Sequence, residues 1–200
     1  MKLINEYLST KIKKSQIIAD DDNIKEIVRK EISRLGNNAD LNHIDTSKVT
    51  NMESVFRLRQ FNGDISEWNV SNVTNMNYMF QGTLRFNCDL RNWDVSNVKS
   101  MTKMFSADKE FEGNGLENWK ISPDITYMDG MFLGCENLKA DLSEWKLNGR
   151  KLNDVTAMFK SCRIFECDLS SWEISKYAIR TEMFKFCPII RKKNLQPKYV

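Results

Sequence analysis

Four aspartates recur at one position of a repeated phrase, and a column of carboxylates is the first pattern in this chain that offers chemistry. They are Asp64, Asp89, Asp141 and Asp168. Calcium-binding repeats place several oxygen ligands of each repeat in one glycine-rich turn, whereas the neighbouring residues here supply only a single Asn or Gly. We therefore expect these side chains to form or cap turns, with a calcium ladder as the alternative. We predict no metal site and no cofactor.

The cysteines also align with the repeat and form no paired Cys-x-x-Cys motif. Cys135, Cys162 and Cys187 each follow a Met-Phe pair by three residues. Neighbouring strands lie about 4.8 Å apart, a distance that a disulfide can bridge. Small buried thiols that fill a core position in a reducing compartment are the interpretation we favour.

His43 is the only histidine of the chain, and Asp45 and Ser47 stand close to it in the sequence. The three residue types resemble a catalytic trio, but residues two apart on one strand lie too far from each other to relay a proton directly. One histidine and unpaired cysteines also give little support to a zinc site. We predict no catalytic residues and no enzymatic activity.

A phrase of the type apolar-x-x-Met-x-x-apolar-Phe returns about every 25 residues. Between its copies stands a second phrase, Phe-x-x-Asp-(Ile/Leu)-x-x-Trp-x-apolar, so that all five tryptophans share one repeat position. Large apolar residues two apart indicate a short strand, and the spacing of three, three and one indicates a helical or 3₁₀ turn. Because a unit of this size cannot bury its own apolar face, we expect the copies to stack.

The repeats carry a resemblance to a known family. Residues 69–80 read NVSNVTNMNYMF and residues 86–96 read FNCDLRNWDVS. This pattern resembles the BspA-type repeat of bacterial surface proteins and lipoproteins, a family grouped with leucine-rich repeats, over roughly residues 41–190. The resemblance implies a curved strand-plus-helix solenoid that binds other molecules, often on cell surfaces.

The ends of the chain differ from the repeats. Apolar residues at helical spacing in residues 3–12 predict a short basic amphipathic helix, and residues 23–35 predict a second helix that begins after acidic residues and ends before Gly36. We expect Ile24, Ile27, Val28 and Leu35 to cover the first repeat. The basic segment after Phe184 is expected to protect the last strand edge, with a basic patch for an anionic partner as the alternative.

Together these patterns predict an α/β repeat solenoid, a leucine-rich-repeat-like stack of about six strand-plus-short-helix coils with an N-terminal helical cap. We predict three segments: a helical cap at residues 1–40, the repeat solenoid at residues 41–193 and a basic tail at residues 194–200.

The charge and the hydrophobic pattern limit the classes of partner and the locations that we expect for this protein. The formal net charge of +3 is evenly interleaved, without the basic and aromatic groove that tracks a nucleic acid, so nucleic acid is not the expected partner. No stretch approaches the roughly 18 to 20 apolar residues of a membrane span, and neither an export signal nor a lipobox cysteine is seen near the start. We expect a cytoplasmic monomer, with the cell surface as the alternative if a leader is missing from this sequence.

Side chains next to each tryptophan vary from repeat to repeat while the core residues recur, which is the pattern of a recognition face on a uniform scaffold. We predict a non-enzymatic module that binds a protein partner through the exposed strand face. The alternative is a structural or packaging component, encoded by a phage or mobile element and docked through its N-terminal helix. The expected partner-binding residues are Glu67, Asn69, Asn92, Asp94, Asn118, Lys120, Glu144 and Lys146.

Overall fold

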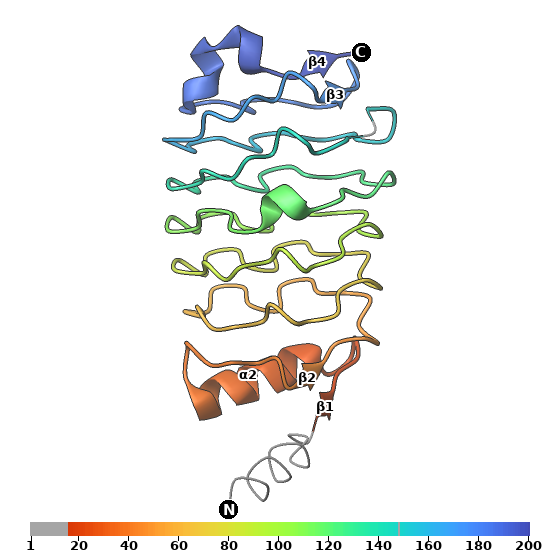
Figure 1. Cartoon of the computed structure of the whole chain (residues 1–200), viewed down its shortest axis with the longest axis vertical. Coiled ribbons are helices and arrows are strands. Elements are labelled where there is room, and N and C mark those ends of the chain that lie inside the picture. Colours follow the sequence, from red (N-terminus) through yellow and green to blue (C-terminus); the bar gives the residue numbers. More distant parts are fainter. Residues whose placement is uncertain (1–15, 148) are drawn as a thin grey trace, which may run out of the picture.

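The computed structural model describes residues 16–147 and 149–200, so the helix predicted within residues 3–12 lies outside the described residues. Figure 1 shows an elongated body in which successive stretches of chain lie one above another. Its elements are β1 (Ile17–Ile18), α2 (Ile24–Leu35), β2 (Ile44–Asp45), η1 (Leu116–Asn118), β3 (Glu173–Ile174), η2 (Pro188–Arg191), η3 (Lys193–Leu195) and β4 (Lys198–Tyr199). β1 pairs with β2 and β3 pairs with β4, both in parallel.

The fold class predicted from the sequence is wrong. Over residues 16–147 and 149–200 there is one α-helix, and the four strands have two residues each and form two two-stranded sheets. Neither a short helix nor a continuous strand recurs with each repeat, so the molecule is not an α/β solenoid of strand-plus-helix coils. Between β2 and β3 the chain consists mostly of turns and isolated parallel bridges.

Left-handed residues explain why the methionine phrase forms no helix. Ser54, Tyr78 and Lys103 each stand two positions after a methionine, with φ of 60°, 58° and 52°. Further residues with positive φ stand two positions after the phenylalanines, as at Leu58 and Ala107. A right-handed helix cannot contain such residues. The spacing of three, three and one in the methionine phrase therefore arises from consecutive turns, in which left-handed residues stand four positions apart.

Backbone hydrogen bonds join each stretch of chain to the corresponding stretch of the next repeat. The Phe56 N–H donates to the Met79 carbonyl at 2.9 Å, and the Phe80 N–H donates to the Met104 carbonyl at 2.8 Å. Parallel bridges link equivalent positions in the order Asn51, Asn75, Ser100, Tyr127, Asp154 and Ile179. We call each such stretch a layer, and the bonds show that consecutive layers run in parallel register.

The core consists of columns of large side chains that pass through the layers. Trp119 lies 6.5 Å from Trp93 and 6.2 Å from Trp145 between ring centroids, with nearly parallel planes. Each indole Nε1–H donates to a backbone carbonyl of the preceding layer at 2.8–3.1 Å. Phe80 stacks in the same way between Phe56 and Phe105. The apolar side chains of one layer are therefore buried by those of its neighbours.

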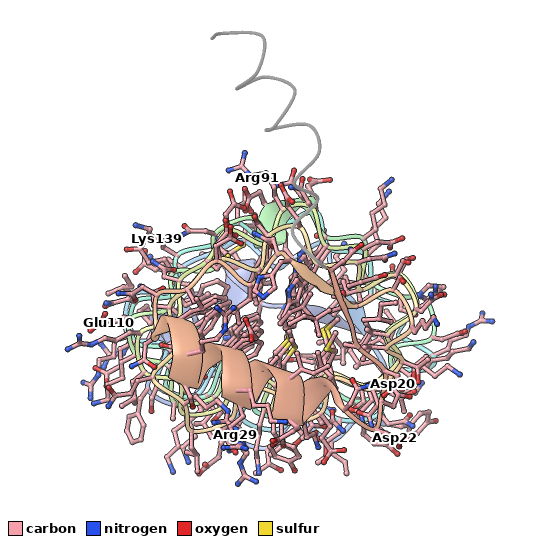
Figure 2. The ribbon with its side chains drawn as sticks, turned by 90° about the horizontal axis from the view of Figure 1, so that it is seen from below. Asp20, Asp22, Arg29, Arg91, Glu110 and Lys139 are labelled. Atoms are coloured by element: carbon pink, nitrogen blue, oxygen red, sulfur yellow. The ribbon has the colours of Figure 1, made fainter. Side chains whose placement is uncertain are left out.

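Helix α2 lies across the N-terminal end of the body (Figure 2). Ile24 and Val28 are fully buried, and Ile27 packs against the core from a partly buried position. Leu35, which the sequence pattern assigned to the same contact, is 44% exposed. Ile32 also packs against the core from a partly buried position, so the helix covers the first layer through Ile24, Ile27, Val28 and Ile32 and not through Leu35, its last residue.

At the opposite end, the C-terminal segment covers the last layer. Ile189 is fully buried, and the Lys198 and Val200 N–H groups donate to the carbonyls of Trp172 and Ile174 at 2.9 and 3.0 Å. The Leu169 N–H donates to the Leu195 carbonyl at 2.9 Å. These bonds satisfy backbone groups that the final repeat would otherwise expose at its edge.

Ala107→Gly tests the cost of the left-handed turns. Ala107 has a φ of 62° at the position that Gly82 and Gly134 occupy in the adjacent layers. Glycine adopts this conformation without the steric cost that an L-residue bears, so we expect the substitution to raise the free energy of unfolding by about 0.5–1 kcal/mol. Urea unfolding measures the change. Gly134→Ala is the matched control and should lower stability, because a methyl group there meets no atom closer than 3.8 Å and only φ is strained.

Candidate functional site

The recurrent aspartates form turns. The N–H groups of Ser66, Ser143 and Ser170 donate to the Oδ1 atoms of Asp64, Asp141 and Asp168 at 2.9–3.0 Å. Asp89 accepts the Arg91 N–H in the same way at 3.0 Å. These backbone hydrogen bonds lower the pKa of the Asp64, Asp141 and Asp168 carboxyls. The expected turn-forming role is confirmed, and no group of three or more His, Cys, Asp or Glu side chains in residues 16–147 and 149–200 is placed to hold a metal ion.

His43 belongs to a structural cluster between α2 and the first layer. Its Nε2 lies 2.9 Å from Glu31 Oε2, and both side chains are nearly buried. The Arg34 guanidinium also donates to Glu31 and is the main cause of the lowered pKa of that carboxyl, to which His43 adds. Asp45 accepts the Ser47 N–H at 2.9 Å instead of orienting His43. The three residues of the superficial trio therefore do not form one site.

The aligned cysteines are buried thiols. Cys135 Sγ donates to the Phe105 carbonyl and Cys162 Sγ to the Phe132 carbonyl, each at 3.0 Å. All of the cysteines are free, and burial raises the pKa of both of these thiols well above the ordinary value. A thiol of raised pKa is a poor nucleophile. These side chains therefore serve packing and interlayer hydrogen bonding.

Asp108 is a fully buried carboxyl that the sequence patterns did not single out. It stands three residues after Phe105, at the position of Thr83 in the layer before it and Cys135 in the layer after it. The residue is fully buried, and neither carboxyl oxygen makes a hydrogen bond of good geometry within the described part of the chain. Burial is the main cause that raises the pKa of the carboxyl to about 8; the charge of Glu110 adds to the rise, and the backbone N–H groups of Phe86 and Glu110 oppose it. Asp108 occupies the repeat position at which Cys135, Cys162 and Cys187 stand in later layers, and this alignment could have identified it as a core position.

The eight predicted partner-binding residues lie on one side of the tryptophan column. Each directly precedes or follows a tryptophan that is 1–3% exposed, and all eight are themselves exposed. We call this surface the tryptophan-flanking face. Its residues lie in turns and irregular segments, with Asn118 in η1, and none of the eight lies in a strand such as the sequence predicted.

Three of the eight side chains also stabilise this face. Asn69 Oδ1 accepts the Ser71 N–H at 3.1 Å, and Asp94 Oδ1 accepts the Ser96 N–H at 3.0 Å. Asn118 Nδ2 donates to Glu117 Oε1 at 3.2 Å. Asx turns of this type fix the local backbone. Asn69 and Asp94 therefore have a structural role in addition to any contact with a partner.

Glu144 and Lys146 border a hollow of about 330 Å³ on the same face. Ser171 and Glu173 of the following layer complete its rim, and Ser171 Oγ donates to the Ser143 carbonyl at 2.7 Å. Trp145, whose ring is buried in the core between Trp119 and Trp172, also contributes to the lining between these two residues. The structure thus brings two of the eight residues together at a concave site with both charges available.

The comparisons with known proteins identify a family but no individual relative. No curated protein matches the chain, and no solved structure matches it. No helix in the described part of the chain is long and apolar enough to cross a membrane. The family model described as "Mycoplasma protein of unknown function, DUF285" matches residues 23–145 and, in a second overlapping match, residues 90–196. Most of the chain lies within these matches, and the protein belongs to this family.

Proposed function

We propose that this protein is a non-enzymatic interaction module that binds a protein partner through the tryptophan-flanking face. The observation that carries the proposal is the exposure of all eight variable side chains beside tryptophans that are fixed and buried. Each indole is held by a hydrogen bond to the layer before it, so the backbone beneath the face is rigid. A rigid surface loses little conformational entropy on association.

The character of the face changes along the molecule. Glu67, Asn69, Asn92 and Asp94 carry acidic or neutral side chains in the earlier layers, whereas Lys120 and Lys146 add positive charge in the later ones. Charge patterns of this kind steer a partner and fix its register more than they raise affinity. The proposed partner is a protein whose surface is basic opposite the earlier layers and acidic opposite Lys120 and Lys146.

The resemblance to BspA-type repeats supports the same class of function, because those repeats belong to proteins that bind other molecules. The DUF285 match is consistent with that resemblance at the level of the family. We propose a bacterial interaction protein on this ground. The cytoplasmic location and the monomeric state remain predictions. Docking of a packaging component through residues 3–12 concerns a segment outside the described residues.

A charge-reversed face tests the proposal. The variant Glu67→Lys, Lys120→Glu, Glu144→Lys, Lys146→Glu changes four exposed side chains and leaves the Asx turns of Asn69 and Asp94 intact. We expect a partner isolated from the native host with the wild-type chain to bind this variant at least about tenfold more weakly in isothermal titration calorimetry.

The matched control reverses Lys25 and Lys30 of α2, which are exposed at the N-terminal end. This control should retain full affinity, and circular dichroism should show that both variants are folded. Equal affinity of the face variant and the wild type for every isolated partner would contradict the proposal.

A further inference from the structure

The C-terminal end of the molecule has a second hollow, which lies apart from the tryptophan-flanking face. We call it the C-terminal hollow; its volume is about 560 Å³, within the range of ligand-binding clefts. Its apolar lining is Phe186, Cys187, Pro188 and Ile190. Its polar lining is Arg163, Glu166, Arg191 and Lys192. Apolar walls with a mostly basic rim are thus brought together by η2 and the turn that precedes it.

Phe186 is held there in an unfavourable backbone conformation. Its φ is 61°, and its side chain is 68% exposed. The corresponding position is Leu58, Gly82, Ala107, Gly134 and Ser161 in five earlier layers. A bulky aromatic residue in the left-handed region is rare, and an exposed ring gains little burial energy to offset that cost. The backbone strain at Phe186 is offset only by limited burial and by the Lys185 ammonium, which lies 5.5 Å from the ring centroid.

Ile190 adds a second exposed apolar side chain at the border of the hollow, with 51% of its surface accessible. Ile164, on the preceding layer, is 54% exposed. By contrast, Ile189 between these surface residues is fully buried and anchors η2 to the core. The hollow therefore has a fixed base and accessible apolar walls.

The charge of this end is strongly one-sided. From Lys185 to the C-terminus the sequence has Lys185, Arg191, Lys192, Lys193 and Lys198 and no acidic side chain. Some of the cations around the hollow are already paired: Lys192 with Glu166 at 2.6 Å and Arg163 with Glu136 at 2.9 Å. Arg191 and Lys193 make no ion pair with any described residue. Arg191 lines the hollow and Lys193 stands two residues further along the chain, so both are available to an anionic ligand that extends beyond the hollow.

We propose that the C-terminal hollow is a second binding site, which takes an acidic peptide segment of a partner protein and receives one of its apolar side chains against Phe186 and Ile190. Arg191 and Lys193 then pair with the carboxylates that flank this anchor. Charge complementarity favours an acidic segment, and the concave apolar lining favours a side chain that inserts. A bilayer would instead contact apolar groups on a protruding surface, whereas Phe186 and Ile190 line a concave one.

Selection from a phage-displayed library of random 12-residue peptides on the immobilised full chain tests this site. We expect the enriched peptides to share acidic residues around one large apolar residue. Fluorescence anisotropy with the synthetic consensus peptide should then show at least about tenfold weaker binding to Phe186→Gly and to Arg191→Glu. Binding should also weaken as salt increases.

The chain supplies matched controls for both variants. Leu58→Gly removes an exposed apolar side chain with φ of 57° at the equivalent position near the other end, and Lys25→Glu reverses a charge on α2. Both controls should bind the peptide like the wild type. Phe186→Gly relieves a left-handed residue, so it should remain folded, with an unchanged or higher melting temperature.

Three results would overturn the proposal. The first is a selection in which no peptide is enriched more strongly on the wild type than on Phe186→Gly. Another is a consensus without acidic residues, or one whose peptide binds Phe186→Gly and Arg191→Glu as tightly as the wild type. The third is that the wild-type protein sediments with phosphatidylserine vesicles, Phe186→Gly does not, and the peptide fails to compete with the vesicles. That result would assign the hollow to a membrane surface.

Discussion

Asp108→Thr should stabilise the protein strongly at neutral and alkaline pH. The wild-type carboxyl is fully buried without a well-aligned hydrogen bond, and burial raises its pKa to about 8 although the backbone N–H groups of Phe86 and Glu110 partly oppose the rise. Threonine occupies the same position in the preceding layer, where the Thr83 hydroxyl donates to the Phe80 carbonyl at 2.5 Å. We expect a gain on the order of 3–5 kcal/mol in the free energy of unfolding at pH 8.

The pH dependence has a definite sign. Between the ordinary pKa of an aspartate, about 4, and the folded-state pKa of about 8, the folded protein keeps a proton that the unfolded chain has released. Stability from this group is therefore fully present below about pH 4 and is lost as the pH rises, by about 1.4 kcal/mol per unit. The groups that face Asp108 are Glu110 and Cys135.

Urea unfolding at pH 5, 6, 7 and 8 measures this effect. The difference in the free energy of unfolding between Asp108→Thr and the wild type should increase with pH. Asp22→Thr is the control, because it removes an exposed carboxylate from the start of α2 and should follow the wild-type profile. A constant difference between Asp108→Thr and the wild type across this range would show that Asp108 is ionised in the folded state.

Trp119→Ala should cost about 3–5 kcal/mol of stability, which is a large part of the total for a protein of this size. The ring is 3% exposed and lies within 6.5 Å of Trp93, Trp145 and Phe105 between centroids. Its Nε1–H donates to the Leu90 carbonyl at 2.9 Å. The substitution removes the ring contacts on both sides and leaves the Leu90 carbonyl with the Trp93 N–H as its remaining donor, at 3.1 Å.

Comparison with a tryptophan at the end of the column sharpens this test. Trp68 is near the N-terminal end of the column, and its ring lies 5.5 Å from that of Phe56 between centroids, so Trp68→Ala should cost less than Trp119→Ala. Trp119→Phe should fall between the wild type and Trp119→Ala, because it keeps a ring and loses the hydrogen bond. Chemical denaturation with equal m-values gives the three differences. An unchanged midpoint for Trp119→Ala would refute the columnar core.

The sequence determined which residues are buried, because large apolar side chains at fixed repeat positions have no other way to leave water than to meet their counterparts in the next repeat. The common position of the tryptophans predicted their burial, and Figure 1 shows the layers that result. The exposure of Glu67 and Lys120 beside buried tryptophans followed from the same pattern. The turn role of Asp64 also followed, since a lone aspartate per repeat lacks the ligands of a calcium site.

The sequence did not determine the local conformation within a layer. The spacing of the methionine phrase is compatible with a helix and with consecutive turns, and only φ at residues such as Tyr78 and Lys103 decides between them. Propensity does not predict a left-handed tyrosine or lysine. Bonds to the layers on both sides impose that conformation, and these bonds exist only in the assembled structure.

Tertiary structure also decided the state of Asp108 and the form of the C-terminal hollow. An aspartate near Glu110 reads as a solvated charge in the sequence, yet the neighbouring layers bury it beside Cys135. Phe186 and Arg191 meet at one hollow because η2 folds back over the last layer and Ile189 is buried there. The order of side-chain types along the chain decides which residues can be buried. The protonation of a carboxyl and the shape of a binding site depend on how closely neighbouring layers pack and exclude water, which only the tertiary structure decides.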